Sequence, residues 1–314
     1  MDEGTKLNIL KEMLGSCFKT GSEYLFYCPK CNHHKKKLSV NLDKNAFHCW
    51  ICDYRGSSVY RIVRKYGNFN LRKKWEELDG KVDLTESFYD KIFGKKEEKA
   101  EAVFNLPKEF VSLANKRLPM TASEPLKYLS GRNIDKTDII KWKIGYCSSG
   151  EDKNRVIVPS FNYDGRVNFY VGRNYEGNWS KYKNPPGASK DIIFNELYVD
   201  WRNDLCIVEG VFDAIVAENA VPLLGSTMRE GSKLFQEIVK HDTPVYLALD
   251  PDAKKKTVKI VEMMLKYDIE LYTIDVDGYD DVGSMTKEEF KTRKLNATEM
   301  NSKSLLEYRA KRRV

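Results

Sequence analysis

From Leu205 onward, apolar and polar positions alternate in blocks that predict strands and helices in turn. Strands are expected at 205–208 ("LCIV"), 221–226, 244–250 and 269–276, and helices at 211–220, 231–241 and 255–267. Short apolar runs separated by amphipathic segments are typical of a parallel sheet with helices on its faces. The sequence therefore predicts a Rossmann-like α/β domain over residues 204–285, followed by a basic helical tail at 286–314.

Before Leu205 the pattern is different. Two β-branched and aromatic runs within 155–174 flank "NYDG", which predicts a β-hairpin, and short helices are expected at 124–135 and 136–147. Residues 106–203 are thus expected to form an α+β subdomain. Helical periodicity recurs at 57–67, and the dense charge of 68–105 indicates one or two helices and a linker. The chain is predicted to be a multidomain α/β protein.

Four cysteines near the N-terminus have the spacing of a metal site. Cys28, Cys31, Cys49 and Cys52 form C-x2-C-x17-C-x2-C, with short strands expected between the two pairs. Two such pairs suit tetrahedral coordination of one structural zinc ion, which would stabilise a small ribbon over residues 1–67. Because four thiolates complete the shell, neither His34 nor His48 is expected to be a ligand. The alternative is a set of unliganded or redox-active cysteines.

The positive charge of the chain is concentrated in this first quarter. Residues 1–75 hold 15 Lys and Arg against 6 Asp and Glu, a net charge of +9. The net charge of all 314 residues is only +7. Basic and aromatic groups on a rigid module suit a single-stranded nucleic-acid template, and the candidates are His33, His34, Lys35, Lys36, Lys37, Trp50 and Arg55. Alternatively, Trp50 covers the small core of the ribbon, and the lysines form an ordinary solvated face.

Carboxylates follow three strands of the predicted parallel sheet. Glu209 comes after 205–208, Asp250 and Asp252 end the strand at 244–250, and Asp277, Asp280 and Asp281 come after 269–276. The carboxyl ends of parallel strands lie at one edge, where crowded acids repel one another unless a cation holds them. Oxygen ligands without histidine favour Mg²⁺ or Mn²⁺. The alternative is that these acids are helix N-caps.

Several motifs resemble a known family. "VEGVFDA", "LGSTM", "LALDPDA" and "DDVGSM", in this order, resemble the Toprim domain shared by primases, topoisomerases and some nucleases. "RVIVPSFNYDGRVNFYVGR" and "KYKNPPG" resemble the basic subdomain that precedes Toprim in bacterial DnaG-class primases, and the zinc ribbon completes that order. The resemblance covers nearly the whole chain. The four-cysteine ribbon is closer to phage primases than to the usual bacterial Cys/His/Cys2 form.

The resemblance implies roles for individual residues. The catalytic set would be Glu209, Asp250, Asp252 and Asp281, and Asp213 and Asp280 would join them in binding two or more Mg²⁺ or Mn²⁺ ions. Nucleotide or template contacts would come from Arg155, Arg166, Arg173, Lys181 and Asn184. Two departures stand out: the last acidic motif reads "DDVG", and the basic residue expected before the Toprim strand has no counterpart in "IIFNELY".

The implied activity is that of a DNA primase, which makes short RNA primers from ribonucleoside triphosphates on single-stranded DNA by a two-metal-ion mechanism. Its partners would be the template, the nucleotides and the primer–template hybrid. A separate replicative helicase is expected, because the 314 residues contain no G-x4-G-K-[ST] loop. The alternatives are a Toprim nuclease or topoisomerase, and a non-enzymatic zinc-ribbon DNA-binding factor of replication or recombination.

The same sequence predicts a cytoplasmic protein that does not enter membranes. No apolar run approaches the roughly 20 residues of a transmembrane helix. The N-terminus "MDEGTKLNIL" lacks a secretory signal. The basic tail that ends in "LLEYRAKRRV" would either dock the helicase or extend the template path.

Overall fold

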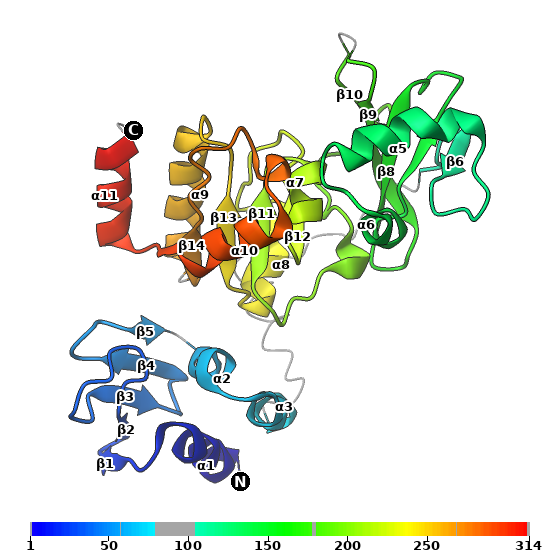
Figure 1. Cartoon of the computed structure of the whole chain (residues 1–314). Coiled ribbons are helices and arrows are strands. Elements are labelled where there is room, and N and C mark those ends of the chain that lie inside the picture. Colours follow the sequence, from blue (N-terminus) through cyan, green and yellow to red (C-terminus); the bar gives the residue numbers. More distant parts are fainter. Residues whose placement is uncertain (1, 57, 79–103, 178–179, 268, 313–314) are drawn as a thin grey trace. The chain divides into compact units, whose positions relative to one another are not determined.

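The computed structural model describes residues 2–56, 58–78, 104–177, 180–267 and 269–312. The chain divides into two compact units, Met1–Lys95 and Lys96–Val314 (Figure 1). Among the described residues, no helix has the length and apolar character needed to cross a bilayer. Most of the segment expected to be a charged linker, residues 79–103, lies outside the described residues.

The first unit is an antiparallel sheet whose one face is covered by helices. The strands, in spatial order, are β1 (Phe18–Thr20), β2 (Glu23–Phe26), β3 (Leu38–Asn41), β4 (Ala46–Cys49) and β5 (Arg55–Gly56). The helices are α1 (Asp2–Leu14), α2 (Tyr60–Tyr66) and α3 (Phe69–Leu78). Alternate strand residues such as Phe26, Leu38 and Val40 form one core with Leu10 and Ile62 of the helices. The strands on both sides of residues 43–45 and the helix at 57–67 were predicted, whereas α1, β1 and β2 were not.

The second unit begins with a five-stranded antiparallel sheet. Its spatial order is β10 (Tyr182–Lys183), β9 (Val167–Asn174), β8 (Arg155–Phe161), β7 (Gly145–Cys147) and β6 (Phe110–Ser112). The β8–β9 hairpin confirms the prediction at 155–174. Helices η1 (Met120–Ala122), α5 (Ser123–Ser130) and α6 (Lys136–Lys141) lie between β6 and β7, and η2 (Glu196–Tyr198) follows β10. The sheet and its helices form the expected α+β subdomain.

The predicted helix at 136–147 is shorter than expected. It ends at Lys141, and residues 145–147 form β7 instead. Lys143 adopts a left-handed conformation, with φ of 54°, which stops the helix. At Gly145 a side chain would meet the Phe110 ring at 2.3 Å, so glycine allows β7 to approach β6 closely.

The carboxyl-terminal part of the second unit is the predicted parallel sheet. Its order is β12 (Ala220–Pro222), β11 (Leu205–Val208), β13 (Val245–Ala248), β14 (Leu271–Thr273) and β15 (Thr298–Glu299), and the first four are parallel. The connecting helices are α7 (Val211–Val216), α8 (Lys233–His241) and α9 (Lys254–Lys266), and η3 (Val282–Ser284) follows β14. The alternation predicted from residue 205 onward is therefore confirmed.

Two elements of this part differ from the prediction. Helix α7 ends at Val216 rather than 220, because Asn219 is left-handed and its side chain donates to the carbonyl oxygens of Asp200 and Asp204. The tail contains α10 (Lys287–Leu295) and α11 (Ser302–Arg312), but β15 lies between them and pairs antiparallel with β14. The sheet is therefore mixed, and the tail is helical only on either side of this strand.

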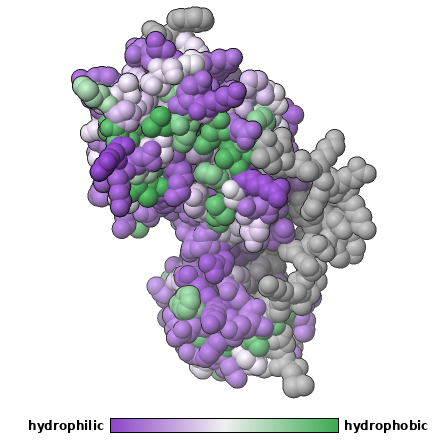
Figure 2. All heavy atoms as spheres, turned by 90° about the vertical axis from the view of Figure 1, so that its right-hand side faces the viewer, coloured by the Kyte–Doolittle hydropathy of each residue, from purple (hydrophilic) through white to green (hydrophobic). Residues whose placement is uncertain are grey.

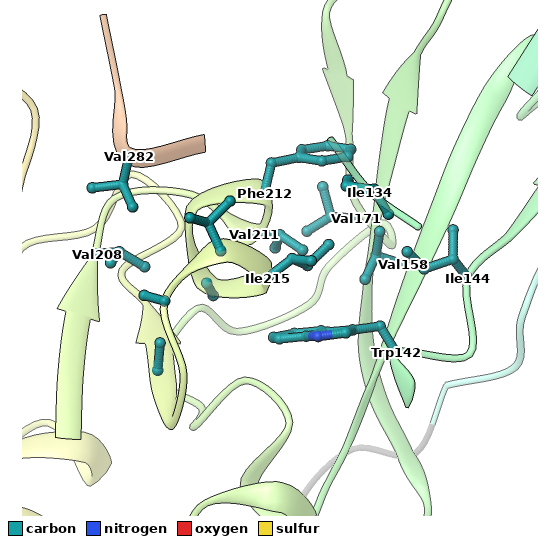
Figure 3. Close-up of a cluster of buried hydrophobic side chains, with 14 of the residues drawn as sticks. Ile134, Trp142, Ile144, Val158, Val171, Val208, Val211, Phe212, Ile215 and Val282 are labelled. Atoms are coloured by element: carbon teal, nitrogen blue, oxygen red, sulfur yellow. The ribbon is translucent and has the colours of Figure 1, made fainter. Parts of the chain in front are cut away.

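Helix α7 joins the two sheets of the second unit. All six of its residues are buried. Figure 3 shows Val211 and Ile215 directed toward Val158 and Val171 of the antiparallel sheet, with Trp142 beneath them, and all five belong to one core cluster. Because α7 directly follows Glu209 and Gly210, this packing holds the carboxyl end of β11 and these two residues in place.

Candidate active site and zinc centre

The zinc centre is built from two matching turns. In each turn the fourth residue after the first cysteine is left-handed: Asn32, with φ of 46°, after Cys28, and Asp53, with φ of 55°, after Cys49. Each of these residues donates its backbone N–H to the carbonyl oxygen of that cysteine, at 2.9 and 3.0 Å. Both turns thereby present two thiols toward a common point, because β2, β3 and β4 pair in register.

The four sulfur atoms are placed to hold one zinc ion. The Sγ atoms of Cys28, Cys31, Cys49 and Cys52 all lie within 4.8 Å of one another. The Cys28–Cys52 and Cys31–Cys49 separations are 3.7 and 3.9 Å. Zn–S bonds of about 2.3 Å in a tetrahedron require S–S edges of about 3.8 Å. Burial raises the pKa of the Cys28 thiol to about 12, so this group needs a bound cation to become a thiolate.

The histidines of the first unit have other partners. His48 Nε2 lies 2.9 Å from Asp53 Oδ1, and the His33 and His34 rings are 4.3 Å apart. Trp50 is 68% exposed, so it does not cover the core of the ribbon. Its ring contacts His48 edge-on at 4.4 Å. This geometry leaves the Trp50 side chain accessible to a ligand.

The basic loop holds aromatic neighbours that the sequence did not single out. Lys36 Nζ lies 4.3 Å from the centre of the Phe18 ring and 5.2 Å from that of Tyr27, and it donates to Ser16 Oγ. Phe18 and Tyr27 are 64% and 45% exposed. On the face of this unit seen in Figure 2, hydrophilic side chains predominate. The remaining basic candidates, Lys35, Lys37 and Arg55, are exposed.

The acidic edge lies where two adjacent parallel strands end. Val208 of β11 pairs with Ala248 of β13, so the two neighbouring strands end side by side. Glu209 and Asp250 follow within two residues of these two ends. Asp252 follows two residues later and is exposed. The structure therefore brings Glu209 and Asp250 to one edge of the sheet.

The charges at this edge affect one another. The pKa of Asp250 is raised to about 7, first by partial burial and then by the charges of Asp213, Glu209, Asp281 and Asp252. These five carboxyl groups therefore form one interacting cluster. Like charges this close oppose ionisation of all members in the absence of a cation.

Two buried oxygen atoms of the cluster accept no hydrogen bond from the described residues. Within the described part of the chain, Glu209 Oε1 and Asp250 Oδ1 are buried and accept no hydrogen bond. The other oxygen of Glu209 accepts from Lys256 Nζ of α9 at 2.6 Å. Buried oxygens without donors fit a hard cation such as Mg²⁺. Among the described residues, no three acids have carboxylate oxygens that all lie within 4.8 Å of one another. The carboxylates are therefore near one another but are not arranged around a single ion position.

Asp213 differs from the rest of the cluster because both of its oxygens are engaged. Oδ2 accepts the N–H of Gly210 at 2.7 Å, and Oδ1 accepts the N–H of Gly283 at 2.8 Å. Burial, followed by the charge of Asp281, raises the pKa of Asp213 to about 6. This side chain ties the turn after β11 to the loop that carries Asp281.

The two aspartates of "DDVG" lie differently. Asp281 is partly buried beside η3 and is among the charges that raise the pKa of both Asp213 and Asp250. Asp280 is exposed, as is Asp277. Asp281 is thus the one that joins the acidic cluster.

The two buried arginines proposed for nucleotide or template contacts lie on opposite faces of their sheet. Arg155 pairs with Asn174, and Arg173 pairs with Val156, so the two guanidinium groups project to different sides. Arg155 donates to Ser180 Oγ, away from the parallel sheet's core cluster. Only Arg173 shares the face that contains Val156 and packs toward α7.

The other three candidates of this set are more exposed. Arg166 lies exposed at the hairpin turn, where its backbone N–H donates to Asn162 Oδ1. Lys181 is exposed and Asn184 is half-buried, on either side of β10. The structure therefore does not gather Arg155, Arg166 and Arg173 at one place.

A groove lies beside the loop that carries Asp281. It has a volume of about 610 Å³ and is lined by Lys127, Tyr128, Arg132 and Tyr175 on one side and by Asp280 and Asp281 on the other. It therefore runs between the α5 region and the acidic loop.

Three cations near the acidic edge were not predicted from the sequence: Lys127, Arg132 and Lys256. Lys256 could have been suspected, because "DPDAKKK" places it in the first turn of the helix after the Asp250 loop. The other two precede the parallel sheet by more than 70 residues, and no local pattern links them to it.

Comparison with known proteins agrees with this architecture. No protein-family model matches the chain. A curated DNA primase of Clostridium acetobutylicum is 24% identical over 345 aligned positions, which cover 94% of this chain and 56% of the relative. The chain spans about half the length of the curated relatives it matches.

Solved structures are similar as well. The Aquifex aeolicus primase, comprising its zinc-binding and RNA polymerase domains, covers 98% of this chain, and this chain covers 88% of it, at 20% identity and a TM-score of 0.51. A DnaG primase catalytic domain bound to ssDNA matches 58% of this chain and 74% of its own length, at 20% identity and a TM-score of 0.49. The chain therefore has the domain order and the fold of the zinc-binding and RNA polymerase (Toprim) domains of DnaG-type DNA primases.

Proposed function

We propose that this protein synthesises short RNA primers from ribonucleoside triphosphates on a single-stranded DNA template. The observation that carries the proposal is the cluster at the ends of β11 and β13. There Glu209 and Asp250 each keep one buried oxygen without a hydrogen-bond donor among the described residues. Carboxylates crowded in this way favour divalent cations, and a purely DNA-binding protein has no need of them.

The proposed metal ligands are Glu209, Asp250, Asp252 and Asp281. Two bound Mg²⁺ or Mn²⁺ ions would neutralise phosphate charge and lower the pKa of an attacking hydroxyl. Asp213 holds the Asp281 loop against the turn at Gly210, because it accepts a hydrogen bond from each side. We assign Asp213 a positioning role, whereas the sequence resemblance counted it among the ligands.

In the proposed reaction, the 3′-hydroxyl oxygen of one ribonucleotide attacks the α-phosphorus of the next. A new O–P bond forms while the bond to the β-phosphate breaks, and pyrophosphate and the hydroxyl proton leave. Positioning and charge neutralisation account for most catalysis of phosphoryl transfer. The groove between Lys127 and Asp281 offers both signs of charge beside the acidic edge.

The zinc unit is proposed to bind the template strand. Its exposed aromatic side chains Trp50, Phe18 and Tyr27, with Lys36 between the last two, suit base stacking combined with phosphate contacts. We also propose a phage-type enzyme that works beside a separate helicase. The four-cysteine set supports the first of these two points.

The decisive experiment is a priming assay on the Asp252→Asn variant. Asp252 is exposed, so its amide should leave the fold intact. Losing one metal ligand should remove several kcal/mol of transition-state stabilisation and lower primer synthesis by about 100-fold or more. The control is Asp164→Asn, an exposed aspartate in the β8–β9 turn. Near-normal priming by Asp252→Asn would contradict the proposal.

The same reactions separate the alternatives. Ribonucleotides, Mg²⁺ and single-stranded DNA yield primers with a primase, whereas cut or relaxed DNA would indicate a Toprim nuclease or topoisomerase. A non-enzymatic DNA-binding factor would give neither product, and its wild-type acidic edge would bind Mn²⁺ no better than the Asp252→Asn variant does.

A further inference from the structure

A lysine occupies one side of the carboxylate that ends β11. Lys256 Nζ of α9 lies 2.6 Å from Glu209 Oε2, and the two side chains are 20% and 17% exposed. Glu209 Oε1 is buried and accepts no hydrogen bond from the described residues. The two oxygens of this carboxylate therefore have different surroundings, because an ammonium group neutralises one and leaves the other to a further cation.

The position of Lys256 is fixed by the turn that follows β13. The backbone N–H of Ala253 donates to Asp250 O at 2.9 Å, which closes a turn just before α9 begins. Thr257 is buried and donates to Ala253 O twice, from its backbone N–H at 2.9 Å and from its hydroxyl at 3.2 Å. The first turn of α9 is thereby tied to the loop that carries Asp250, and Lys256 is held at the acidic edge.

Divalent cations differ in how they use a carboxylate. Ca²⁺ takes about six to eight oxygen ligands and often binds both oxygens of one carboxylate, whereas Mg²⁺ needs near-octahedral geometry and retains several waters. Mn²⁺ also favours octahedral oxygen sites. An ammonium group on Glu209 Oε2 leaves one oxygen of this side chain for a metal. This arrangement suits Mg²⁺ and Mn²⁺, and it deprives Ca²⁺ of a bidentate ligand.

We propose that Lys256 determines the metal selectivity of the acidic edge, because it restricts Glu209 to a single metal-binding oxygen and so disfavours Ca²⁺ relative to Mg²⁺ and Mn²⁺. Lys256 is a positioning residue in this role, since it acts on the metal through Glu209. The inference rests on the proposed primer synthesis, in which Mg²⁺ or Mn²⁺ assists phosphoryl transfer. It adds to that proposal the side chain that selects between the two classes of ion.

The alternative is that Lys256 only balances negative charge in the cation-free protein. Such a counterion opposes all divalent cations equally, since its repulsion depends on charge and distance and not on the number of oxygens that a metal takes. Occupation of Glu209 Oε2 matters in addition to an ion that would use both oxygens. The ratio of Ca²⁺ affinity to Mn²⁺ affinity therefore separates the two roles.

The test measures the affinity of the full chain for Mn²⁺ and for Ca²⁺ by titration, without nucleotides. Lys256→Met removes the ammonium group from Glu209. Mn²⁺ affinity should rise by about 10-fold and Ca²⁺ affinity by about 100-fold, so the affinity ratio shifts by about 10-fold toward Ca²⁺. Lys256→Arg keeps a charge-assisted contact with the carboxylate and should keep the ratio close to that of the wild type.

The matched control is Lys255→Met, which removes an exposed lysine of the same helix and should leave the ratio unchanged. Melting temperature is measured on every variant. Lys256→Gln, which also lacks the charge, carries the test if Lys256→Met does not fold, and it should shift the ratio in the same direction.

Equal gains for the two ions, or no gain in Ca²⁺ affinity, overturn the inference and leave the proposed metal site standing. A wild type that binds Mn²⁺ no better than the Asp252→Asn variant overturns the proposed metal site and the inference with it. Because binding is measured without primer synthesis, a ratio that shifts toward Ca²⁺ supports the inference even if no primers form.

Discussion

Replacing Asp250 with asparagine should make the cation-free protein more stable at alkaline pH. The pKa of Asp250 lies near 7 instead of 3.8, because the group is partly buried among other carboxylates. A group whose pKa is raised by folding costs nothing below its unfolded pKa, and stability is lost as the pH rises through the folded value. Asparagine has nearly the same shape without the charge, so it should remove this loss.

The size of the effect follows from the same shift. A pKa of about 7 against 3.8 corresponds to about 4 kcal/mol for a fully buried carboxylate. Because Asp250 is only half-buried, solvent screening should reduce this to about 2 kcal/mol at pH 8. At pH 5 the gain should fall to about a third of that, since the folded group is then protonated. For a unit of this size, about 2 kcal/mol raises the melting temperature by about 4–8 °C.

The assay is thermal unfolding in EDTA at pH 5 and pH 8, with Asp164→Asn as the control. Adding Mn²⁺ at pH 8 should stabilise the wild type more than the Asp250→Asn variant, because the cation relieves the same repulsion. A variant that is no more stable than wild type at pH 8, or equally stabilised at both pH values, would refute the reasoning.

Three further variants test other contacts. Cys52→Ser should reduce the zinc content below one ion per chain and abolish cooperative unfolding of the first unit, measured by metal analysis and circular dichroism. Gly283→Ala should cost about 1–3 kcal/mol in denaturant unfolding, because its methyl group would lie 2.9 Å from Asp213 Oδ1. Lys256→Met should raise Mn²⁺ affinity about 10-fold in titrations, because it removes the cation that pairs with Glu209.

Each of these variants has a matched control. Cys17→Ser removes a half-buried cysteine outside the zinc set, Gly231→Ala adds a methyl group in open space, and Lys255→Met removes an exposed lysine of the same helix. Unchanged zinc content in Cys52→Ser, wild-type stability in Gly283→Ala, or Mn²⁺ affinity that falls in Lys256→Met would contradict the respective argument.

Sequence patterns predicted the features that depend on local spacing. The cysteine pairs specify their turns within a few residues, and their sulfur atoms do meet. Likewise, Glu209 and Asp250 follow short apolar runs that predict buried strands, and parallel strands end at a common edge.

Contacts between distant segments could not be predicted in this way. Arg155 and Arg173 project to opposite faces because of the register in which β8 pairs with β9. A sequence motif does not specify which residues of two strands pair with each other. The family resemblance implied that Asp213 is a metal ligand. Its engagement by Gly283, 70 residues away, depends on how the η3 loop returns to α7.

The short strand β15 has a practical consequence for anyone who wishes to produce the Toprim part alone. Thr298 and Glu299 pair with β14, and the N–H of Met300 donates to Leu271 O at 2.8 Å. A fragment cut at residue 285 would expose the backbone donors and acceptors of β14 on that side. Such an unpaired sheet edge can pair with the strands of other chains, which promotes aggregation. A soluble fragment should therefore extend past Met300.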